Sequence, residues 1–155
     1  MGYIENNLMQ GEAVIYKTNL TKFILVYPIA LLFLIPIIIG LSGAKAELSV
    51  MYFTISIFVF IPMEIAYFLQ YWTSEFAVTD HRVLIKVGFI RRKSLEILLA
   101  KVEGISVDQG IFGRIFDYGT IVVRGTGGTG EPFSKICAPF EFRKKVQEQI
   151  SKKQR

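Results

Sequence analysis

The sequence predicts an α+β protein in two joined parts: a hairpin of two membrane-spanning helices and a domain of short β-strands that ends in a helix. Two long apolar runs, at about residues 23–41 and 48–71, contain Glu64 as their single charged residue. After residue 73, apolar and polar residues alternate between closely spaced turn residues. We therefore expect an N-terminal tail with the first strand (1–21), a transmembrane hairpin (22–72) and a mostly β domain (73–155).

The composition narrows the class of protein. Hydrophobic residues make up 52% of the 155 residues, and the mean hydropathy of +0.42 is high for a soluble domain. Cys137 is the single cysteine and His81 the single histidine, which excludes an intrachain disulfide and a metal site rich in these residues. We expect Cys137 to be a small buried residue and His81 to be solvated. No catalytic residue, cofactor or metal ligand is predicted, and we do not expect an enzyme.

The apolar runs have the length of membrane spans. As a helix, residues 23–41 would extend roughly 28 Å, close to the thickness of the bilayer core. Tyr67, Tyr71 and Trp72 close the second run with aromatic residues typical of the lipid–water interface. The connection at 42–47 is short, so the two helices are expected to be antiparallel neighbours.

Basic residues indicate the orientation of the hairpin. The connection between the runs contains Lys45 alone among basic residues. A basic cluster follows the second run: Arg82, Lys86, Arg91, Arg92 and Lys93. Basic flanks favour the cytoplasmic side, so both termini are predicted to be cytoplasmic. Residues 44–46 also resemble a signal-peptidase site, but the apolar run before them is longer than a usual signal core, and a polar tail of about twenty residues precedes that run.

Glu64 is an acid inside the second run. It could form a proton or ion site, with Thr54 and Ser56 as the other polar residues of a transport or channel path. It could instead lie near the inner interface, where its carboxylate reaches headgroup water or pairs with a base. We favour the second interpretation because Glu64 lies about two helical turns from Trp72.

The alternating pattern predicts seven short strands. They are expected at 12–17, 75–79, 83–87, 91–98, 102–109, 120–124 and 131–136. The first precedes the hairpin and the second follows it, so the hairpin is predicted to be an insertion between these two strands. Pro132 indicates that the last strand is an edge strand. A closing helix begins at Pro139, with Phe142, Val146 and Ile150 on one apolar face.

Several stretches resemble one known family. They are GEAVIY (11–16), EFAVTDHRVLIKVGFIRRKSLEI (75–97), KVEGISVDQGIFGRIFDYGTIVVRGTGGT (101–129) and PF (132–133). Nearly the whole chain is similar to the second class of bacterial membrane-anchored pleckstrin-homology (PH) domains, although Asp80-His81 stands where Asn and Lys are more usual. The resemblance implies a PH-like fold, a seven-stranded sandwich or partly open barrel capped by the C-terminal helix. It also implies attachment to the bacterial inner membrane, no known catalysis and no established ligand.

A basic run and a glycine-rich stretch are candidate binding features. Arg91, Arg92 and Lys93 could contact anionic lipid headgroups, each contributing on the order of 1 kcal/mol near a membrane surface. The same run could simply reflect the basic character of cytoplasmic flanks. The stretch 125–130 lacks the helix and the Lys of a phosphate-binding loop, so it is predicted to be a flexible hairpin.

An apolar segment between the strands is a candidate interaction surface. Ile111, Phe112, Ile115 and Phe116 form two apolar pairs four residues apart, which predicts one short helical turn. The turn could plug the end of the barrel, face the membrane hairpin or contact another subunit. The plug is the simplest interpretation.

These features favour binding over catalysis. The first hypothesis is a membrane-anchored PH-like scaffold that binds a protein or another copy of itself, so a homo-oligomer is expected. The second is a module that binds anionic lipid headgroups through the basic run. A small transport or channel component is the weakest alternative, and no nucleic-acid partner is expected.

Overall fold

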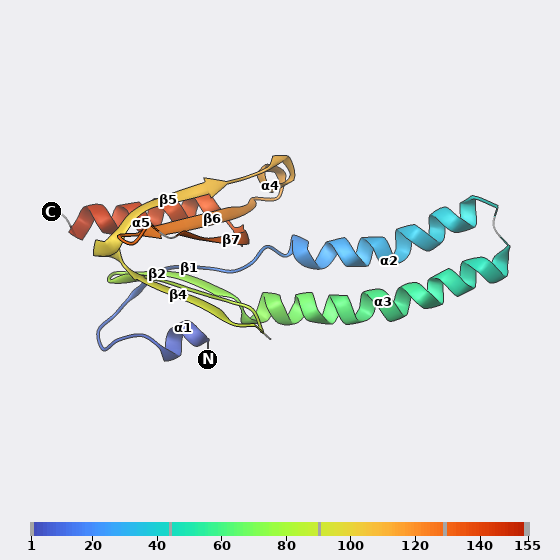
Figure 1. Cartoon of the computed structure of the whole chain (residues 1–155), viewed down its shortest axis with the longest axis horizontal. Coiled ribbons are helices and arrows are strands. Elements are labelled where there is room, and N and C mark those ends of the chain that lie inside the picture. The colour runs from blue at the N-terminus through green and yellow to red at the C-terminus, as the bar shows by residue number, and fades with distance from the viewer. Residues whose placement is uncertain (1, 44, 90, 129, 154–155) are drawn as a thin grey trace. The chain divides into compact units, whose positions relative to one another are not determined.

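The computed structural model describes residues 2–43, 45–89, 91–128 and 130–153. It divides the chain into two compact units (Figure 1). One unit, which we call the β domain, contains Met1–Thr21 and Trp72–Arg155, and the other, the helical unit, contains Lys22–Tyr71. The chain thus leaves the β domain after Thr21 and returns to it at Trp72.

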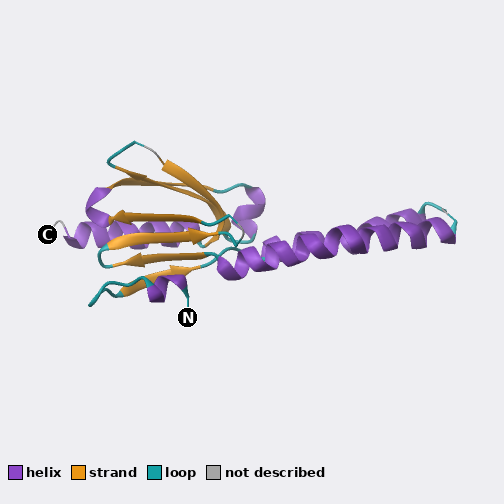
Figure 2. Ribbon diagram, turned by 60° about the horizontal axis from the view of Figure 1, so that its bottom comes forward, coloured by secondary structure: helices purple, strands orange, loops and turns teal. Residues whose placement is uncertain are grey.

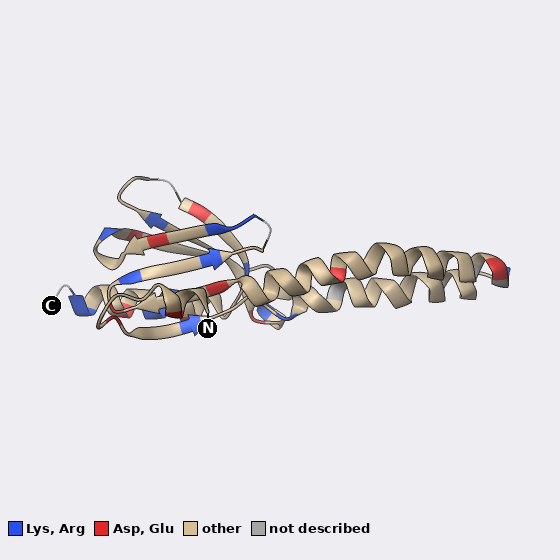
Figure 3. Cartoon of the chain, turned by 90° about the horizontal axis from the view of Figure 1, so that it is seen from below, with Lys and Arg blue, Asp and Glu red and all other residues tan. Residues whose placement is uncertain are grey.

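The helical unit consists of α2 (Phe23–Leu41) and most of α3 (Ala46–Thr73), which run alongside each other (Figures 1 and 3). Within the described residues, Val50–Thr73 is the one helical stretch long and apolar enough to cross a membrane. Pro28–Leu41 in α2 is a shorter apolar stretch. The two predicted helices are therefore present, and α3 has the length and composition of a membrane span.

In the part of the chain that the structure describes, seven strands form two antiparallel sheets (Figure 2). The first sheet has the order β1 (Val14–Thr18), β2 (Glu75–Thr79), β3 (Arg82–Val87), β4 (Lys93–Leu98). The second has the order β5 (Val102–Asp108), β6 (Tyr118–Gly125), β7 (Gly130–Cys137). The other elements are η1 (Leu99–Lys101, a 3₁₀ turn), α4 (Ile111–Ile115) and α5 (Pro139–Lys153). This α+β arrangement agrees with the predicted strands and closing helix.

β1 and β2 are antiparallel neighbours although the helical unit separates them in the sequence. At the end of β1, Thr18 pairs with Phe76 of β2. This pairing confirms that the strand before the hairpin joins the strands after it. β1 begins at Val14 rather than at Glu12, because the N–H of Glu12 donates to the carbonyl of Met9 in a turn.

The core lies between the sheets and α5, which packs against strands of both sheets. The fully buried apolar side chains of this core include Phe76, Val78, Val83, Ile85, Leu99, Ile121, Val123, Ile136, Phe142 and Val146. Phe76 meets Phe133 of the second sheet edge to face, with ring centroids 6.3 Å apart. Phe142 and Val146 confirm the predicted apolar face of the last helix, and Ile150 is half-buried.

A short N-terminal helix covers the outer face of the first sheet. Ile4 of α1 (Tyr3–Asn6) packs with Ala77 of β2 and Leu84 of β3, and Leu8 lies against them. β2 and β3 are therefore buried on both faces. The sequence pattern did not predict α1.

Part of the outer edge of β7 is occupied by the segment that follows β1. Leu20 forms an isolated antiparallel bridge with Ile136, and the N–H of Cys137 donates to the carbonyl of Asn19 at 3.0 Å. β7 is the terminal strand of its sheet, which confirms the edge position indicated by Pro132.

Candidate functional site

One end of the β domain holds both points at which the chain leaves and re-enters it. Thr18 pairs with Phe76 at this end of β1 and β2, and the hydroxyl of Thr18 donates to the carbonyl of Cys137 at 3.0 Å. The N–H of Ala138 donates to the carbonyl of Asp117 at 3.0 Å, which brings the turn after α4 to the same end. We call this region the exit end; it lies on the right of the β domain in Figure 1, where α4 is labelled.

The predicted basic run lies at the exit end, where Arg91 and Arg92 belong to the loop between β3 and β4 and Lys93 is the first residue of β4. The N–H of Gly88 donates to the hydroxyl of Ser74 at 3.3 Å, beside the point where the chain re-enters the domain. Gly88 has a φ of 95°, and an added Cβ would collide with the carbonyl oxygen of Arg91. A glycine is therefore required for this tight turn, which presents Arg91 and Arg92 to solvent.

The three basic residues of the run are not equivalent. Arg91 and Arg92 are exposed, whereas the ammonium of Lys93 lies 3.7 Å from the carboxylate of Glu131. Both partners of this ion pair are more than half exposed, so it contributes less than about 1 kcal/mol to stability. Arg91 and Arg92 are consequently better placed than Lys93 to contact an anionic surface.

The apolar turn forms α4 and is strongly exposed. The exposed fractions are 78% for Ile111, 66% for Phe112, 67% for Ile115 and 48% for Phe116. These values contradict the interpretation that the turn plugs the barrel. The four side chains remain candidates for an interaction surface.

Gly113 explains why the apolar side chains of α4 face outward. Gly113 is buried, and an added Cβ there would collide with the carbonyl oxygen of Tyr118. The side-chain amide of Gln109 donates to the carbonyl of Gly113 at 3.0 Å and fixes the turn. The glycine face of α4 therefore packs against the start of β6, and the apolar side chains lie on the other faces.

A buried ion pair joins the N-terminal tail to β3. Nε and Nη2 of Arg82 donate to the two carboxylate oxygens of Glu12, each at 2.9 Å. The side chains are 8% exposed for Arg82 and 1% exposed for Glu12. Arg82 also donates to Glu96 at 2.8 Å and to the carbonyl of Asn7 at 2.6 Å, and the hydroxyl of Thr79 donates to Glu12 at 2.7 Å. This set satisfies both buried charges with hydrogen bonds.

The contacts keep Glu12 ionised. Its hydrogen bonds from Arg82 lower the pKa of the Glu12 carboxyl from 4.5 to about 2, against the opposing effect of burial. The hydrogen bonds that Arg82 donates to the Glu12 carboxylate also raise the pKa of Arg82. Because both side chains are enclosed, the pair fixes the tail to the domain and does not present a reactive group. Residue spacing alone does not reveal this pair, although Glu12 and Arg82 lie in the stretches that resemble the PH family, 11–16 and 75–97.

A second acid fixes α1. The carboxylate of Glu75 accepts the N–H groups of Tyr3 and Ile4 at 3.1 Å each and lies 3.7 Å from the ammonium of Lys17. The ammonium of Lys86 lies 4.5 Å from the centroid of the Tyr3 ring. The N-terminal segment is thus an integral part of the β domain.

Glu64, the predicted intramembrane polar site, lies in α3. One of its carboxylate oxygens is buried and lacks a hydrogen-bond partner among the described residues. The hydroxyls of Thr54 and Ser56 donate to the carbonyls of Val50 and Phe53 in the same helix, at 2.9 and 2.7 Å. Because these hydroxyls are satisfied locally, they add no support to a polar transport path.

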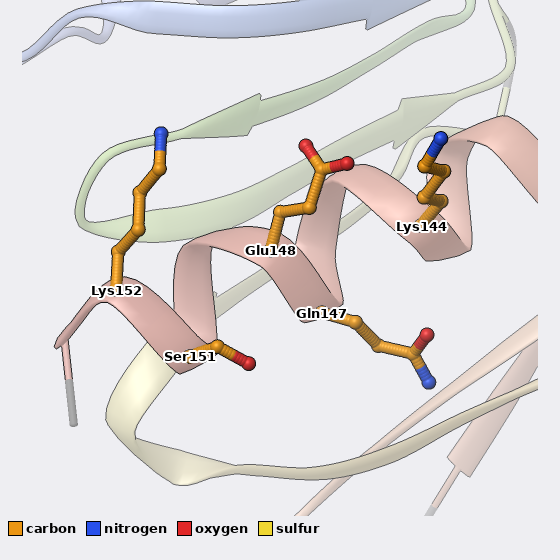
Figure 4. Close-up of a pocket in the computed structure, with 5 residues that line it drawn as sticks. All are labelled: Lys144, Gln147, Glu148, Ser151 and Lys152. Atoms are coloured by element: carbon orange, nitrogen blue, oxygen red, sulfur yellow. The ribbon is translucent and has the colours of Figure 1, made fainter. Parts of the chain in front are cut away.

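The depression on α5 does not have the form of a binding site. It has a volume of about 410 Å³ and is lined by Lys144, Gln147, Glu148, Ser151 and Lys152 (Figure 4). Figure 4 shows that all five side chains come from this one helix. They form an open polar surface, on which Lys145 and Glu148 pair at 3.2 Å.

Within the described residues, no group of three or more His, Cys, Asp or Glu side chains could hold a metal ion. The His81 side chain is 54% exposed and lies 2.9 Å from Asp80, and Cys137 is half-buried rather than fully buried. The glycine-rich stretch connects β6 to β7, as expected of a hairpin; its Thr129 lies outside the described residues.

Comparison with known proteins agrees with this geometry. A family model described as Bacterial PH domain matches residues 22–154, which include the helical unit and strands β2 to β7. A separate comparison with curated proteins found no match.

Proposed function

Since this chain belongs to the bacterial PH domain family, we propose that it is a non-catalytic binding module that its helical unit anchors in the bacterial inner membrane. PH domains are generally binding modules rather than enzymes. The β domain would then act at the membrane surface. Its proposed partners are other copies of the same chain and the lipid itself.

The exposed apolar surface of the helical unit carries this proposal. Val50–Thr73 has the length and composition of a membrane span. In its most apolar stretch of 18 residues, 6% is buried. Phe58 is 76% exposed and Leu41 is 83% exposed. A core helix of a soluble protein would be mostly buried, and a signal sequence would lie near the N-terminus. Lipid is the environment that matches such a surface.

The distribution of basic residues supports a cytoplasmic location for both termini. The short connection between α2 and α3 carries Lys45, whereas Arg82, Lys86, Arg91 and Arg92 follow α3. Figure 3 shows long stretches of both helices without charged residues. Two spans return the chain to the side from which it started.

Self-association through strand edges is the proposed scaffold function. β4 is a terminal strand of the first sheet, and β5 is a terminal strand of the second. Terminal strands offer main-chain donors and acceptors to another chain. The edge of β7 is less suited, because Pro132 lacks an N–H and Leu20 already bridges to Ile136.

Cysteine labelling tests the orientation. In a Cys137→Ser background, Ser42→Cys should react with an impermeant maleimide on intact cells, whereas Gly127→Cys in the β domain should react after permeabilisation. Both positions are exposed. The reverse labelling pattern would overturn the proposed topology. Mass photometry of the full chain in nanodiscs tests self-association, and a single monomeric mass would overturn it.

A second candidate function is recognition of anionic headgroups by Arg91 and Arg92. It is supported by the exposure of both side chains and by the hydrogen bond that places Gly88 beside Ser74. In nanodiscs, trypsin should cleave after Arg91 and Arg92 more slowly with anionic than with neutral lipid. High salt should remove the difference, since it screens charge. Cleavage after the exposed Lys152 serves as the control, and equal protection at all sites would contradict headgroup recognition.

A further inference from the structure

We propose that α4 and Phe116 form a wedge that inserts into the lipid interface of the membrane in which the helical unit is anchored. This inference rests on the proposed anchoring and adds a second, independent attachment. The β domain would then be held against the bilayer, rather than swinging freely at the end of two helices.

The first support is the concentration of exposed apolar side chains. Ile111, Phe112 and Ile115 are each at least 66% exposed, and Phe116 is 48% exposed. Isolated exposed apolar residues are ordinary on soluble proteins, but four within six positions form a contiguous apolar feature. Phenylalanine and isoleucine are suited to burial at the boundary between headgroups and acyl chains.

The backbone of α4 prevents these side chains from folding back into the domain. Gly113 packs so closely against Tyr118 that an added Cβ would collide with its carbonyl oxygen. Gln109 holds the same glycine by a hydrogen bond of 3.0 Å. The glycine face is thus committed to the domain, and the apolar faces require another partner to leave water.

The position of α4 identifies that partner as lipid. The carbonyl of Asp117, directly after the wedge, accepts the N–H of Ala138. The neighbouring Cys137 donates to Asn19, two residues before the chain leaves the domain at Thr21. The wedge therefore lies at the exit end, from which the chain continues into the apolar helices. Trp72, where the chain returns, is 70% exposed.

The wedge is too small for a stable contact between subunits. It comprises one helical turn and Phe116, whereas stable protein interfaces use roughly 20–30 residues on each side. Short apolar projections are instead sufficient for interfacial insertion, which requires no complementary shape.

The surroundings of the wedge differ in charge from the loop that carries Arg91 and Arg92. Arg114 is exposed on α4, and Arg143 lies 5.3 Å from the ring of Phe140 near the same end. The exposed acids Asp117 and Glu141 offset these two cations. Insertion of the wedge should therefore depend weakly on salt and on anionic lipid, unlike contact by the arginines of the loop.

Tryptophan scanning of the full chain in nanodiscs tests the wedge. In a Trp72→Phe background, a single tryptophan is placed by Phe112→Trp, and lipids brominated on the acyl chains serve as quenchers. Phe58→Trp in the helical unit is the positive control, and Leu98→Trp is the negative control. Leu98 is 45% exposed and pairs with Arg82 at the other end of β3.

We expect the tryptophan at 112 to emit at shorter wavelength than that at 98, and to lose at least half of its emission in brominated lipid. Quenching at 58 without quenching at 112 would overturn the wedge and leave the anchoring intact. Absence of quenching at 58 would instead overturn the anchoring itself. Blue-shifted but unquenched emission at 112 would show that protein covers α4, and would also overturn the wedge.

Discussion

Arg82 holds Glu12 by two hydrogen bonds of 2.9 Å, although the two residues lie 70 positions apart and on opposite sides of the helical unit in the sequence. The pair links the tail before α2 to a strand after α3. Because the Glu12 side chain is 1% exposed, solvent cannot replace Arg82 as its partner. Stability of the β domain should therefore depend on this contact.

Arg82→Met should lower the free energy of unfolding of the β domain by about 3–5 kcal/mol, because it leaves a buried carboxylate without its ionic partner. Native-state hydrogen exchange of β2 and β3 amides in the full chain measures this change. Lys145→Ala removes the more exposed pair with Glu148 and should cost less than about 1 kcal/mol. Equal effects of the two variants would contradict the importance of the buried pair.

Acid should weaken the same contact. The pKa of Glu12 is about 2 in the folded protein against an ordinary 4.5, so the folded state holds the proton less tightly than the unfolded chain. Its stabilising contribution is present above about pH 4.5 and is lost as the pH falls toward 2. Hydrogen exchange measured across this window should show a loss of about 3 kcal/mol. In Glu12→Gln the slope over the same window should be smaller; an unchanged slope would assign the acid sensitivity to other groups.

Two phenylalanines of α5 should respond differently to truncation. Phe142 is fully buried and its ring lies 6.3 Å from that of Tyr16, so Phe142→Ala should cost about 3–5 kcal/mol. Phe140 is 47% exposed, so Phe140→Ala should cost less than about 1 kcal/mol. Thermal melts of both variants in the same detergent provide the measurement. A larger effect at 140 would show that this exposed ring is covered in the assembled protein.

Gly113→Ala should disturb α4, because the new methyl group would meet the carbonyl of Tyr118. We expect a loss of about 1–3 kcal/mol, as for overpacking elsewhere in proteins. Gly110→Ala, three positions earlier, meets nothing within 4 Å at a φ of −70° and should cost less than about 1 kcal/mol, from the preference for glycine over alanine at the N-cap of α4. Melting temperatures of the two variants measure this difference in stability. Equal values would show that α4 can shift to accommodate the methyl group without a loss of stability.

The sequence pattern predicted those elements in which apolar residues recur at the regular spacing of a strand or a helix. In β4, Leu95 and Ile97 alternate with polar residues, and in α5 the positions of Phe142 and Val146 follow a helical period, so these elements were predictable. The insertion of the hairpin was predictable because strand-like stretches lie on both sides of it in the sequence. α1 was not, because Tyr3–Asn6 is too short to be helical by itself and is held by Glu75.

The candidate site was predicted less completely than the fold. Apolar spacing identified the turn that contains Phe112, but it could not show that Gly113 directs the side chains outward. Local spacing also cannot reveal contacts between distant segments, such as Lys93 with Glu131 or Arg82 with Glu12. Such pairs depend on strand register and turn geometry, which form with the tertiary structure.

The adjacency of β1 and β2 has a consequence for the order of assembly. Their contact spans the whole helical unit in sequence, so it is a non-local pairing whose closure is entropically costly in a free chain. If α2 and α3 insert into the membrane as the proposed hairpin, insertion itself brings the ends near Thr21 and Trp72 together. Membrane insertion would then precede and accelerate closure of the sheet. A chain that fails to insert would leave the edges of β1 and β2 open, and the newly made protein would be exposed to aggregation and proteolysis until its helices reach lipid.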